Sequence, residues 1–291
     1  MKEEEWEVNE RPNELDGRKV CLITGSSAGI GKAMAIKMAE IGYEIIMLVR
    51  DCDKSRLALA EVKQRSGSDN VRLYYVDLAS QQSIRDVVER IKNDLDRIDI
   101  LVNNAGVFRR SPQKSPDGFE MTLAVNYLAP FLLTTLLLPL LDATPNSRVV
   151  NVTSELCRKG VADLDIQADD GRFNGNQAYA NSKLLLVMFT RGLAKRLEKS
   201  GTTVNCVHPG VVATDVFREY PRWFNRLLNR FISKPEDGAA HVVRLASSSA
   251  LDGVTGKYFS KSEEKAIVTS AGWEKDRERV WTRSEELTGT G

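Results

Sequence analysis

Tyr179 and Lys183 are the two residues of this chain whose types and spacing most directly suggest chemistry. They lie four residues apart at the start of an apolar-periodic segment. On a helix, that spacing puts the phenol and the ammonium on one face, one turn apart. A neighbouring ammonium favours the phenolate and so lowers the pKa of a tyrosine from its usual value of about 10. Such a tyrosine can exchange a proton with a substrate oxygen near neutral pH. The pair alone is weak evidence, because most such pairs are a core aromatic residue beside a solvated charge.

A second pattern, near the start of the chain, predicts a dinucleotide site. The β-branched run Val20–Thr24 is typical of a buried strand, and Gly25, Gly29 and Gly31 follow it before a helix of small and apolar residues. Glycines permit a tight turn and a close approach of the backbone to a pyrophosphate, and the first amides of the helix point at the phosphates. The alternative is a plain strand–turn–helix that binds no ligand. A second predicted strand at 44–50 makes this alternative the less favoured one.

Composition fits a single enzyme domain. The chain has 291 residues, enough for a large core, and its formal net charge of +1 gives no electrostatic case for a nucleic-acid partner. Its four cysteines contain no CxxC pair. We therefore expect reduced thiols, no disulfide framework and no metal site.

The apolar runs of the sequence favour a cytoplasmic protein. Residues 1–17 are acidic and polar and lack the features of a signal peptide. The most apolar run, at 132–141, contains a proline and is too short for a membrane span. The apolar helices predicted around 126–141 and 180–194 could pair across a homodimer or belong to the core of a monomer.

Strand-like and helical runs alternate along most of the chain. We predict strands at 20–24, 44–49, 71–76, 98–103, 148–153, 202–207 and 256–260, and helices that include 80–95, 119–141, 177–199 and 235–248. This alternation predicts an α/β fold, a single Rossmann-type, doubly wound, mostly parallel seven-stranded sheet with helices on both faces.

The expected domain organisation follows from this alternation. Residues 18–265 form the Rossmann-type domain, with a polar arm at 1–17 and a C-terminal extension at 266–291. Two irregular segments, 155–176 and 211–234, follow strand ends, where ligands bind in open α/β sheets. We expect both segments to frame the substrate.

Short motifs recur in one order along the chain. They are Thr24-Gly25-Ser26-Ser27-Ala28-Gly29-Ile30-Gly31, Asp77-Leu78, Asn103-Asn104-Ala105-Gly106, Asn126, Ser154, Tyr179-x-x-x-Lys183 and Pro209-Gly210. In type, order and spacing these motifs resemble those of a known family, the short-chain dehydrogenases/reductases, over nearly the whole length of the chain. The stretches at 48–51, 115–120, 126–141 and 208–215 are most similar to the retinol-dehydrogenase-like branch. Membrane-bound members of that branch often carry an N-terminal hydrophobic anchor, which the polar residues 1–17 do not resemble.

The resemblance implies roles for four polar residues. Tyr179 would be the general acid in carbonyl reduction or the general base in alcohol oxidation. Lys183 would lower the pKa of Tyr179 and hold the nicotinamide ribose hydroxyls. Ser154 would hydrogen-bond the substrate oxygen and stabilise developing alkoxide charge. Asn126 would anchor a water that links Lys183 to solvent, or, alternatively, would only satisfy a kinked helix. For His208 we expect a structural or positioning role.

Cofactor choice depends on the end of the second strand. An NAD site usually places an acidic residue there to hold the ribose 2′-hydroxyl, whereas this strand ends in Arg50, followed by Asp51 and Lys54. Because arginine offers a planar fork to a 2′-phosphate, we expect NADP (NADPH), with NAD held by Asp51 as the less favoured alternative. The expected cofactor-binding residues are Gly25, Ser26, Ser27, Gly29, Ile30, Gly31, Arg50, Asp51, Lys54, Asp77, Leu78, Asn104, Ala105, Gly106, Tyr179, Lys183, Pro209, Gly210, Val212 and Thr214.

Two classes of function remain open at this point. The first is an NADP(H)-dependent oxidoreductase that interconverts an alcohol and a carbonyl on an apolar small molecule, such as a retinoid, steroid, lipid aldehyde or xenobiotic carbonyl. The second is a catalytically weak regulatory or scaffold protein that binds a nucleotide on the same fold. Degenerate members of the family usually lose the tyrosine or the lysine. This chain keeps both, which favours the enzyme.

The segment 216–232 combines basic and aromatic side chains. Its arginines recur every four residues, and its aromatic and leucine residues fall mostly on the other side of a helix. We expect a mobile lid whose aromatic face lines an apolar substrate pocket. The alternatives are a membrane-surface helix, which would give peripheral membrane contact, and a helix docked on the core with a solvated arginine stripe.

Overall fold

The computed structural model of the chain describes residues 17–165, 173–210, 233–267 and 273–291. Most of the expected lid, 211–234, therefore lies outside the described residues, together with Val212, Thr214 and the basic and aromatic segment 216–232. Residues 166–172 of the first irregular segment and residues 1–16 of the polar arm also lie outside them.

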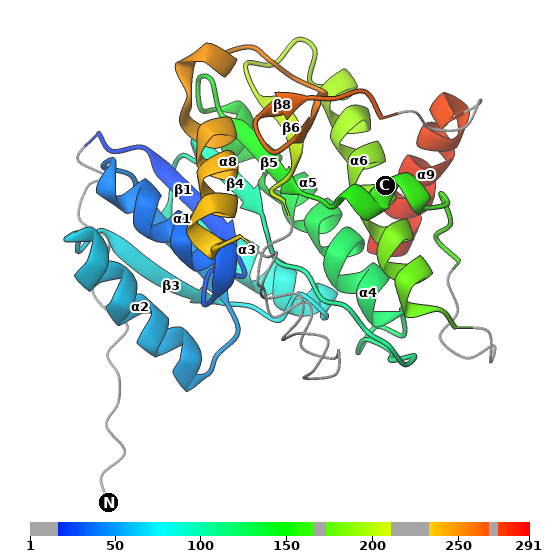
Figure 1. Cartoon of the computed structure of the whole chain (residues 1–291), viewed down its shortest axis with the longest axis horizontal. Coiled ribbons are helices and arrows are strands. Elements are labelled where there is room, and N and C mark those ends of the chain that lie inside the picture. Colours follow the sequence, from blue (N-terminus) through cyan, green and yellow to red (C-terminus); the bar gives the residue numbers. More distant parts are fainter. Residues whose placement is uncertain (1–16, 166–172, 211–232, 268–272) are drawn as a thin grey trace, which may run out of the picture.

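One sheet forms the centre of the fold (Figure 1). It has eight strands in the order β3-β2-β1-β4-β5-β6-β7-β8. All neighbouring strands are parallel except β7 and β8, which are antiparallel. The predicted α/β fold with a mostly parallel sheet is confirmed. The strands are β1 Val20–Thr24, β2 Glu44–Val49, β3 Val71–Tyr75, β4 Ile100–Asn103, β5 Arg148–Val152, β6 Thr203–His208, β7 Tyr258–Ser260 and β8 Glu263–Glu264.

The seven predicted strands are all present, and β8 adds an eighth at the sheet edge. β8 consists of two exposed glutamates, so it carries no hydrophobic pattern that a sequence could display. A turn with Lys261 in the left-handed region, at a φ of 56°, brings Glu263 opposite Ser260. The turn and the available edge of β7 therefore decide where β8 forms.

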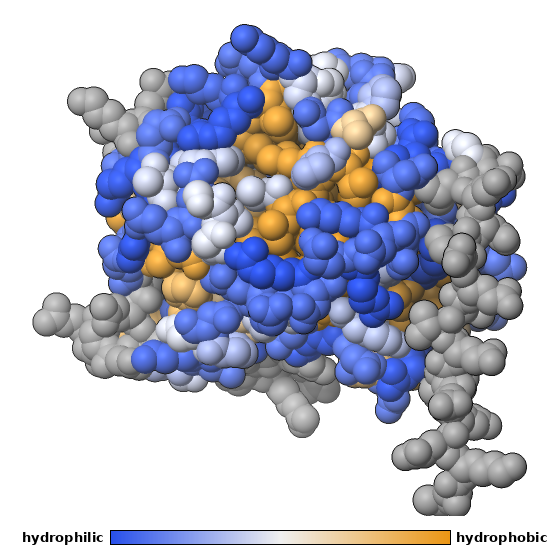
Figure 2. Space-filling model, turned by 180° about the vertical axis from the view of Figure 1, so that it is seen from behind, coloured by the Kyte–Doolittle hydropathy of each residue, from blue (hydrophilic) through white to orange (hydrophobic). Residues whose placement is uncertain are grey.

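Helices cover both faces of the sheet (Figure 1). One apolar core packs α1, α2 and α8 on one face, and a second core packs α3, α5, α6 and α9 on the other. The surface seen from behind the view of Figure 1 is mostly hydrophilic, and hydrophobic residues are visible between the hydrophilic ones near its middle (Figure 2). The helices are α1 Gly29–Glu40, α2 Asp53–Ser66, α3 Gln81–Asp94, α5 Ala129–Asp142, α6 Gly175–Arg196, α8 Pro235–Ser247 and α9 Trp273–Thr288.

The helix predicted at 119–141 is interrupted by a π-helical turn, η1 (Ala124–Leu128). It lies between the short helix α4 (Met121–Leu123) and α5. The amide of Ala129 donates to the carbonyl of Ala124, five residues back. Pro130 has no N–H and so cannot make the ordinary α-helical bond to the carbonyl of Asn126. The proline therefore favours the wider turn on which Asn126 lies.

The apolar run at 132–141, expected to be too short for a membrane span, is part of a longer continuous helical stretch. Met121–Asp142 has a mean hydropathy of 1.8 and is long enough to cross a membrane, but 72 % of the apolar window is buried inside the fold. Burial of that extent is typical of the core helix of a globular protein.

A chain of buried polar side chains links the centre of the sheet to the helices above it. Asn103 on β4 donates to the hydroxyl of Thr134 (2.9 Å) and to the side-chain carbonyl of Asn151 on β5 (2.8 Å). Asn151 in turn donates to the hydroxyl of Thr190 on α6 at 2.9 Å. Because buried polar groups need partners, these bonds hold α5 and α6 in register with β4 and β5.

Replacing Asn151 with alanine should lower the free energy of unfolding by about 2–4 kcal/mol, because it removes two buried hydrogen bonds and leaves their partners unsatisfied. Urea unfolding followed by circular dichroism measures this change. Gln82→Ala, on the exposed surface of α3, is the control and should change stability by less than about 0.5 kcal/mol. Equal effects of the two substitutions would contradict the role of this polar chain.

Candidate active site

Predicted site residues follow the carboxyl ends of four neighbouring strands, and those expected to choose the cofactor or border its adenine follow β2 and β3. β1 ends at Thr24, β4 at Asn103, β5 at Val152 and β6 at His208, and these strands are adjacent and parallel. Their ends therefore meet at one edge of the sheet, where ligands bind in open α/β folds.

The turn from β1 to α1 needs glycine at two positions. Gly25 has a φ of 67°, in the left-handed region, and its amide donates to the carbonyl of Leu48 at 2.9 Å. A Cβ atom on Gly25 would lie 2.9 Å from the Cα of Ala105. A Cβ atom on Gly31 would lie 2.5 Å from Asn104 Nδ2 and 2.6 Å from the carbonyl oxygen of Gly25. Any side chain at Gly31 would therefore push the turn apart.

The amino end of α1 fits the phosphates of a dinucleotide. The helix begins at Gly29, and its N-cap residue Ala28 makes no side-chain cap to the first amides. The first amides of a helix have no partner within the helix and carry partial positive charge, so they favour an anion. Ser26 is buried and its hydroxyl donates to the carbonyl of Ile23 at 3.0 Å, which closes the turn beneath this end.

A loop at 104–107 braces the glycine turn from the side. The amides of Asn104 and Ala105 donate to the hydroxyl of Thr24 at 2.9 and 3.0 Å. The side-chain amide of Asn104 donates to the carbonyls of Thr24 (2.9 Å) and Gly25 (3.3 Å). These bonds hold β1, its turn and the end of β4 as one unit.

Asn126 clamps the other end of the same loop. Its side-chain oxygen accepts from the amide of Val107 at 2.7 Å, and its side-chain nitrogen donates to the carbonyl of Val107 (2.9 Å) and to the hydroxyl of Ser182 (3.1 Å). A Cβ atom on Gly106 would lie 3.4 Å from Lys183 Nζ and 3.5 Å from Asn126 Oδ1. Gly106 therefore lies beside both the asparagine and the lysine, at ordinary contact distance for an added Cβ.

Lys183 is the most deeply buried charged group of the site, with 3 % of its surface exposed. Its ammonium donates to the carbonyl of Val152, at the end of β5, at 2.9 Å. It also lies 5.8 Å from the centroid of the Tyr179 ring. Burial lowers the pKa of Lys183 from its usual 10.5 to about 8. The group can therefore exchange a proton close to neutral pH.

Tyr179 and Ser154 come from two elements that meet at this lysine's helix. Tyr179 is half-buried, one turn before Lys183 on α6, and its ring meets Phe108 edge-on at 5.9 Å. Ser154 precedes the 3₁₀ helix η2 (Glu155–Lys159), and its hydroxyl oxygen accepts from the amide of Leu156 at 3.3 Å. Thr153, directly before it, donates to the carbonyl of Lys183 at 3.1 Å. The serine is thereby held against the tyrosine–lysine helix.

A polar cluster beside Ser154 was not identified from the sequence. The phenol of Tyr258 on β7 donates to the carboxylate of Glu155 at 2.8 Å, and Arg158 also pairs with this carboxylate. Although burial opposes it, the bond from Tyr258 holds the pKa of Glu155 below its usual value. Burial lowers the pKa of the half-buried His208, which precedes Pro209-Gly210. Since the contacts join residues a hundred positions apart, only the fold reveals this cluster.

The end of β2 presents the residues predicted for cofactor choice. Asp51 forms an ion pair with Arg56 on α2, with 2.6 Å between Oδ1 and Nη1, on the exposed surface. Arg56 was missed in the sequence because it lies five residues beyond the expected acidic position. On the next strand end, the carboxylate of Asp77 accepts from the amide of Ala79 at 3.0 Å, and Leu78 packs on the core.

The cysteines of the site region are free thiols. Cys21, Cys157 and Cys206 are buried and Cys52 is exposed. Burial raises the pKa of Cys157, close to the site, to about 11, so this thiol stays protonated near neutral pH. Among the described residues, no group of three or more His, Cys, Asp or Glu side chains is placed to hold a metal ion.

Comparison with known proteins agrees with this geometry. Residues 19–225 match the sequence model of the short chain dehydrogenase family. Retinol dehydrogenase 13 of Mus musculus is 37 % identical over 93 % of this chain and 84 % of its own length. Retinol dehydrogenase 14 of Homo sapiens is 35 % identical over 96 % of this chain and 88 % of its own length. The chain belongs to the short-chain dehydrogenase/reductase family, and the predicted similarity to the retinol-dehydrogenase-like branch is confirmed.

Solved structures share the fold. An uncharacterized protein from Mycobacterium paratuberculosis superposes with a TM-score of 0.74 at 27 % identity, over 93 % of each chain. A short chain dehydrogenase from Shigella flexneri, complexed with NADP, superposes with a TM-score of 0.68 at 24 % identity, over 84 % of this chain and 97 % of its own. Both superpositions show that the fold of this chain is one that solved structures share.

The lowered pKa of Lys183 predicts how stability changes with pH. Between about 8 and 10.5 the unfolded chain binds a proton at this lysine that the folded protein has lost. The free energy of unfolding should therefore rise with pH across this window, by about 1.4 kcal/mol per pH unit from this group, and its contribution should be flat below pH 8.

Lys183→Met removes this contribution, so its stability relative to the unmodified protein should fall from pH 8 to pH 10. Urea unfolding at several pH values measures the difference. Lys195→Met, on the exposed side of α6, is the control and should give a constant difference. A constant difference for Lys183→Met as well would contradict the burial effect.

Proposed function

We propose that this protein is an NADP(H)-dependent oxidoreductase that interconverts an alcohol and a carbonyl on an apolar small molecule. The observation that carries the proposal is the buried ammonium of Lys183, held by the Val152 carbonyl beside the ring of Tyr179. Family membership supports the reaction class, and the local geometry supports the assignment of roles.

In this proposal the nicotinamide, when bound, supplies or accepts the hydride. Tyr179 gives its phenolic proton to the carbonyl oxygen during reduction, or takes the hydroxyl proton during oxidation. The Lys183 ammonium stabilises the phenolate that remains after the proton has left. The residues that would hold the cofactor are those of the glycine turn and the 104–106 loop.

Ser154 is suited to bind the reacting oxygen. Because its hydroxyl oxygen accepts from the amide of Leu156, its single proton stays available to donate to the substrate. A donor aimed at the oxygen stabilises the negative charge that develops there. The cap also fixes the rotation of the serine side chain, which limits the cost of orienting it.

Asn126 is proposed to support the proton path indirectly. Its side chain is engaged by Val107 and Ser182, so it fixes the loop that passes beside the lysine. With a pKa near 8, Lys183 can return a proton to Tyr179 between turnovers. The asparagine thereby keeps Gly106 at the distance that leaves the ammonium in place.

Apolar side chains near the catalytic residues support an apolar substrate. Leu156 and Val161, in the segment after Ser154, are 40 % and 61 % exposed, which is high for large aliphatic residues. Phe108 packs on the ring of Tyr179. Exposed apolar surface beside a polar reacting centre is typical of a site that binds an apolar ligand. Retinoids are among the substrates to test, because the two similar relatives described above are named retinol dehydrogenases.

The end of β2 supports NADP over NAD. Asp51 is the acid expected to hold a ribose hydroxyl in an NAD site, and its carboxylate is paired with Arg56. Arg50 and Lys54 add positive charge at the same strand end. Cationic groups there favour the 2′-phosphate, which carries the charge that distinguishes NADP.

Tyr179→Phe should lower kcat by about 10²–10⁴, because the ring still packs on Phe108 but the proton donor is gone. NADPH binding, measured by fluorescence titration, should change little. Steady-state reduction of aliphatic and retinoid aldehydes gives kcat. Tyr43→Phe, at the amino end of β2, is the control and should retain kcat. A Tyr179→Phe variant with more than about a tenth of the original kcat would remove Tyr179 from its role.

Arg50→Asp should shift cofactor preference from NADP toward NAD by at least about tenfold in the ratio of kcat/KM values, since a charge-assisted contact contributes about 1.5–3 kcal/mol. The substitution puts a repelling carboxylate in place of a phosphate partner. Arg65→Asp, near the other end of α2, is the matched control and should leave the ratio unchanged. If the ratio for Arg50→Asp equals that of the unmodified protein, Arg50 does not determine cofactor choice.

A further inference from the structure

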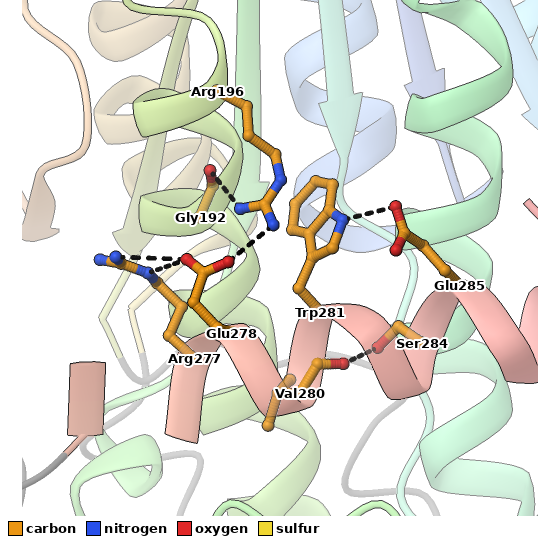
Figure 3. A network of polar contacts seen from close by, with 8 residues as sticks. All are labelled: Gly192, Arg196, Arg277, Glu278, Val280, Trp281, Ser284 and Glu285. Carbon is orange, nitrogen blue, oxygen red and sulfur yellow. Dashed lines mark hydrogen bonds and ion pairs between the residues drawn. The ribbon is translucent and has the colours of Figure 1, made fainter. Parts of the chain in front are cut away.

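Trp281 of the C-terminal helix α9 packs against the helices that carry the site (Figure 3). Trp281 stacks on Phe189 of α6 at 5.8 Å and meets Phe131 of α5 edge-on at 5.1 Å. Gly192 leaves room for the indole, because a Cβ atom there would lie 3.1 Å from the ring. The guanidinium carbon of Arg196 lies 3.7 Å from the centroid of the indole. α9 is thus held at a fixed depth.

Polar contacts fix the rotation of α9 about this anchor (Figure 3). Arg196 of α6 also pairs with Glu278 at 2.9 Å. The indole N–H donates to Glu285 of α9 itself at 2.7 Å, which orients the ring within the helix. At the end of the helix, Gln81 of α3 donates to the carbonyl of Leu287 at 2.9 Å. The helix therefore presents one set of side chains inward.

One of these inward side chains reaches the π-helical turn of the site. Ser284 has no exposed surface, and its hydroxyl lies 2.6 Å from the phenol oxygen of Tyr127. The serine hydroxyl donates its only proton to the carbonyl of Val280 at 2.7 Å. Tyr127 must then be the donor to Ser284. Both groups are fully buried, so water does not compete for this bond.

Tyr127 is the residue directly after Asn126 on η1. A π-helical turn is less favourable than an α-helical one and persists where surrounding contacts hold it. Here Pro130 withholds one backbone donor. The Tyr127–Ser284 bond is a contact from outside the helix to the middle of this turn.

We propose that α9 is a positioning element of the active site, and that Ser284 acts through Tyr127 to hold the π-helical turn on which Asn126 lies. A shift of this turn would move Asn126 away from Val107 and Ser182, and with it the loop that passes beside Lys183. The catalytic consequence rests on the proposed function above, in which Tyr179 and Lys183 move the proton.

α9 also contacts the segment that follows Ser154. Arg279 donates to the carbonyl of Ala162 at 3.2 Å, and Arg283 lies 3.6 Å from the carboxylate of Asp165. One helix near the end of the chain therefore touches both segments that flank the tyrosine and the lysine. This arrangement is consistent with a helix that positions the site.

Three variants separate positioning from stability. Tyr127→Phe removes only the phenolic hydroxyl and leaves Ser284 bonded to Val280, so it should lower the free energy of unfolding little. Ser284→Ala leaves a buried phenol without a partner, so it should cost more. In the double variant both partners are apolar, and stability should recover toward that of the unmodified protein.

The activity of the same variants should not follow their stability. Both single variants and the double variant should lower kcat by about three- to tenfold, with KM for NADPH unchanged within about twofold, because the link to Asn126 is lost in each. Thr288→Ala is the matched control. It removes a buried hydroxyl one turn further along α9 that bonds to the carbonyl of Ser284 and not to η1, and it should retain kcat.

Hydrogen–deuterium exchange gives a readout that does not depend on turnover. Peptides covering 104–107 and 124–128 should exchange faster in Tyr127→Phe and Ser284→Ala, and at the original rate in Thr288→Ala. If the unmodified protein reduces no carbonyl, the proposed function fails, but these exchange rates still decide whether Ser284 holds the turn. Unchanged exchange in both single variants, or a kcat that recovers with stability in the double variant, would overturn the proposal.

Discussion

The buried ammonium of Lys183 is the constraint on which the arrangement of this site depends. A lysine with 3 % exposure has lost almost all of its hydration, and the carbonyl of Val152 at 2.9 Å compensates only part of that loss. The hydration that is lost without compensation lowers the pKa of Lys183. Hydrogen bonds at Thr190 and Thr153 help to hold α6 on the sheet, and with it the lysine at the end of β5. The packing of α6 thus keeps the lysine buried, and burial brings its pKa to about 8, close to neutral pH.

The loop at 104–107 connects the two halves of the site. At its first residues it holds the glycine turn through Thr24 and Asn104, and at its last residue it is held by Asn126. The phosphate end and the catalytic end therefore share a short piece of backbone, with Gly106 beside the lysine. The close approach is tightest at Gly25, where an added Cβ would lie 2.9 Å from the Cα of Ala105 in this loop.

Much of the fold and the core of the site were predictable from the sequence, because they depend on local patterns. Buried β-branched runs predict the parallel strands, the glycines predict the turn at β1, and the i, i+4 spacing places Tyr179 and Lys183 on one helix. The parts that were not predicted depend on contacts between distant residues. The π-helical turn combines Pro130 with a contact from Ser284 of α9 to Tyr127, and β8 pairs with the edge of β7. α9 itself is highly charged. Its inward residues include Val280, Trp281 and Ser284, which form too short a helical pattern to be recognised in the sequence.

The most direct test of the central claim is the transfer of deuterium to an apolar aldehyde from NADPH that carries deuterium at both C4 positions of the nicotinamide, with the product analysed by mass spectrometry. The protein should place one deuterium on the carbinol carbon of the product alcohol, because in the proposed function the cofactor and the substrate meet beside Tyr179, Ser154 and Lys183. An alcohol that carries no label from the cofactor, or the absence of any alcohol across a panel of apolar aldehydes and ketones, would contradict the account.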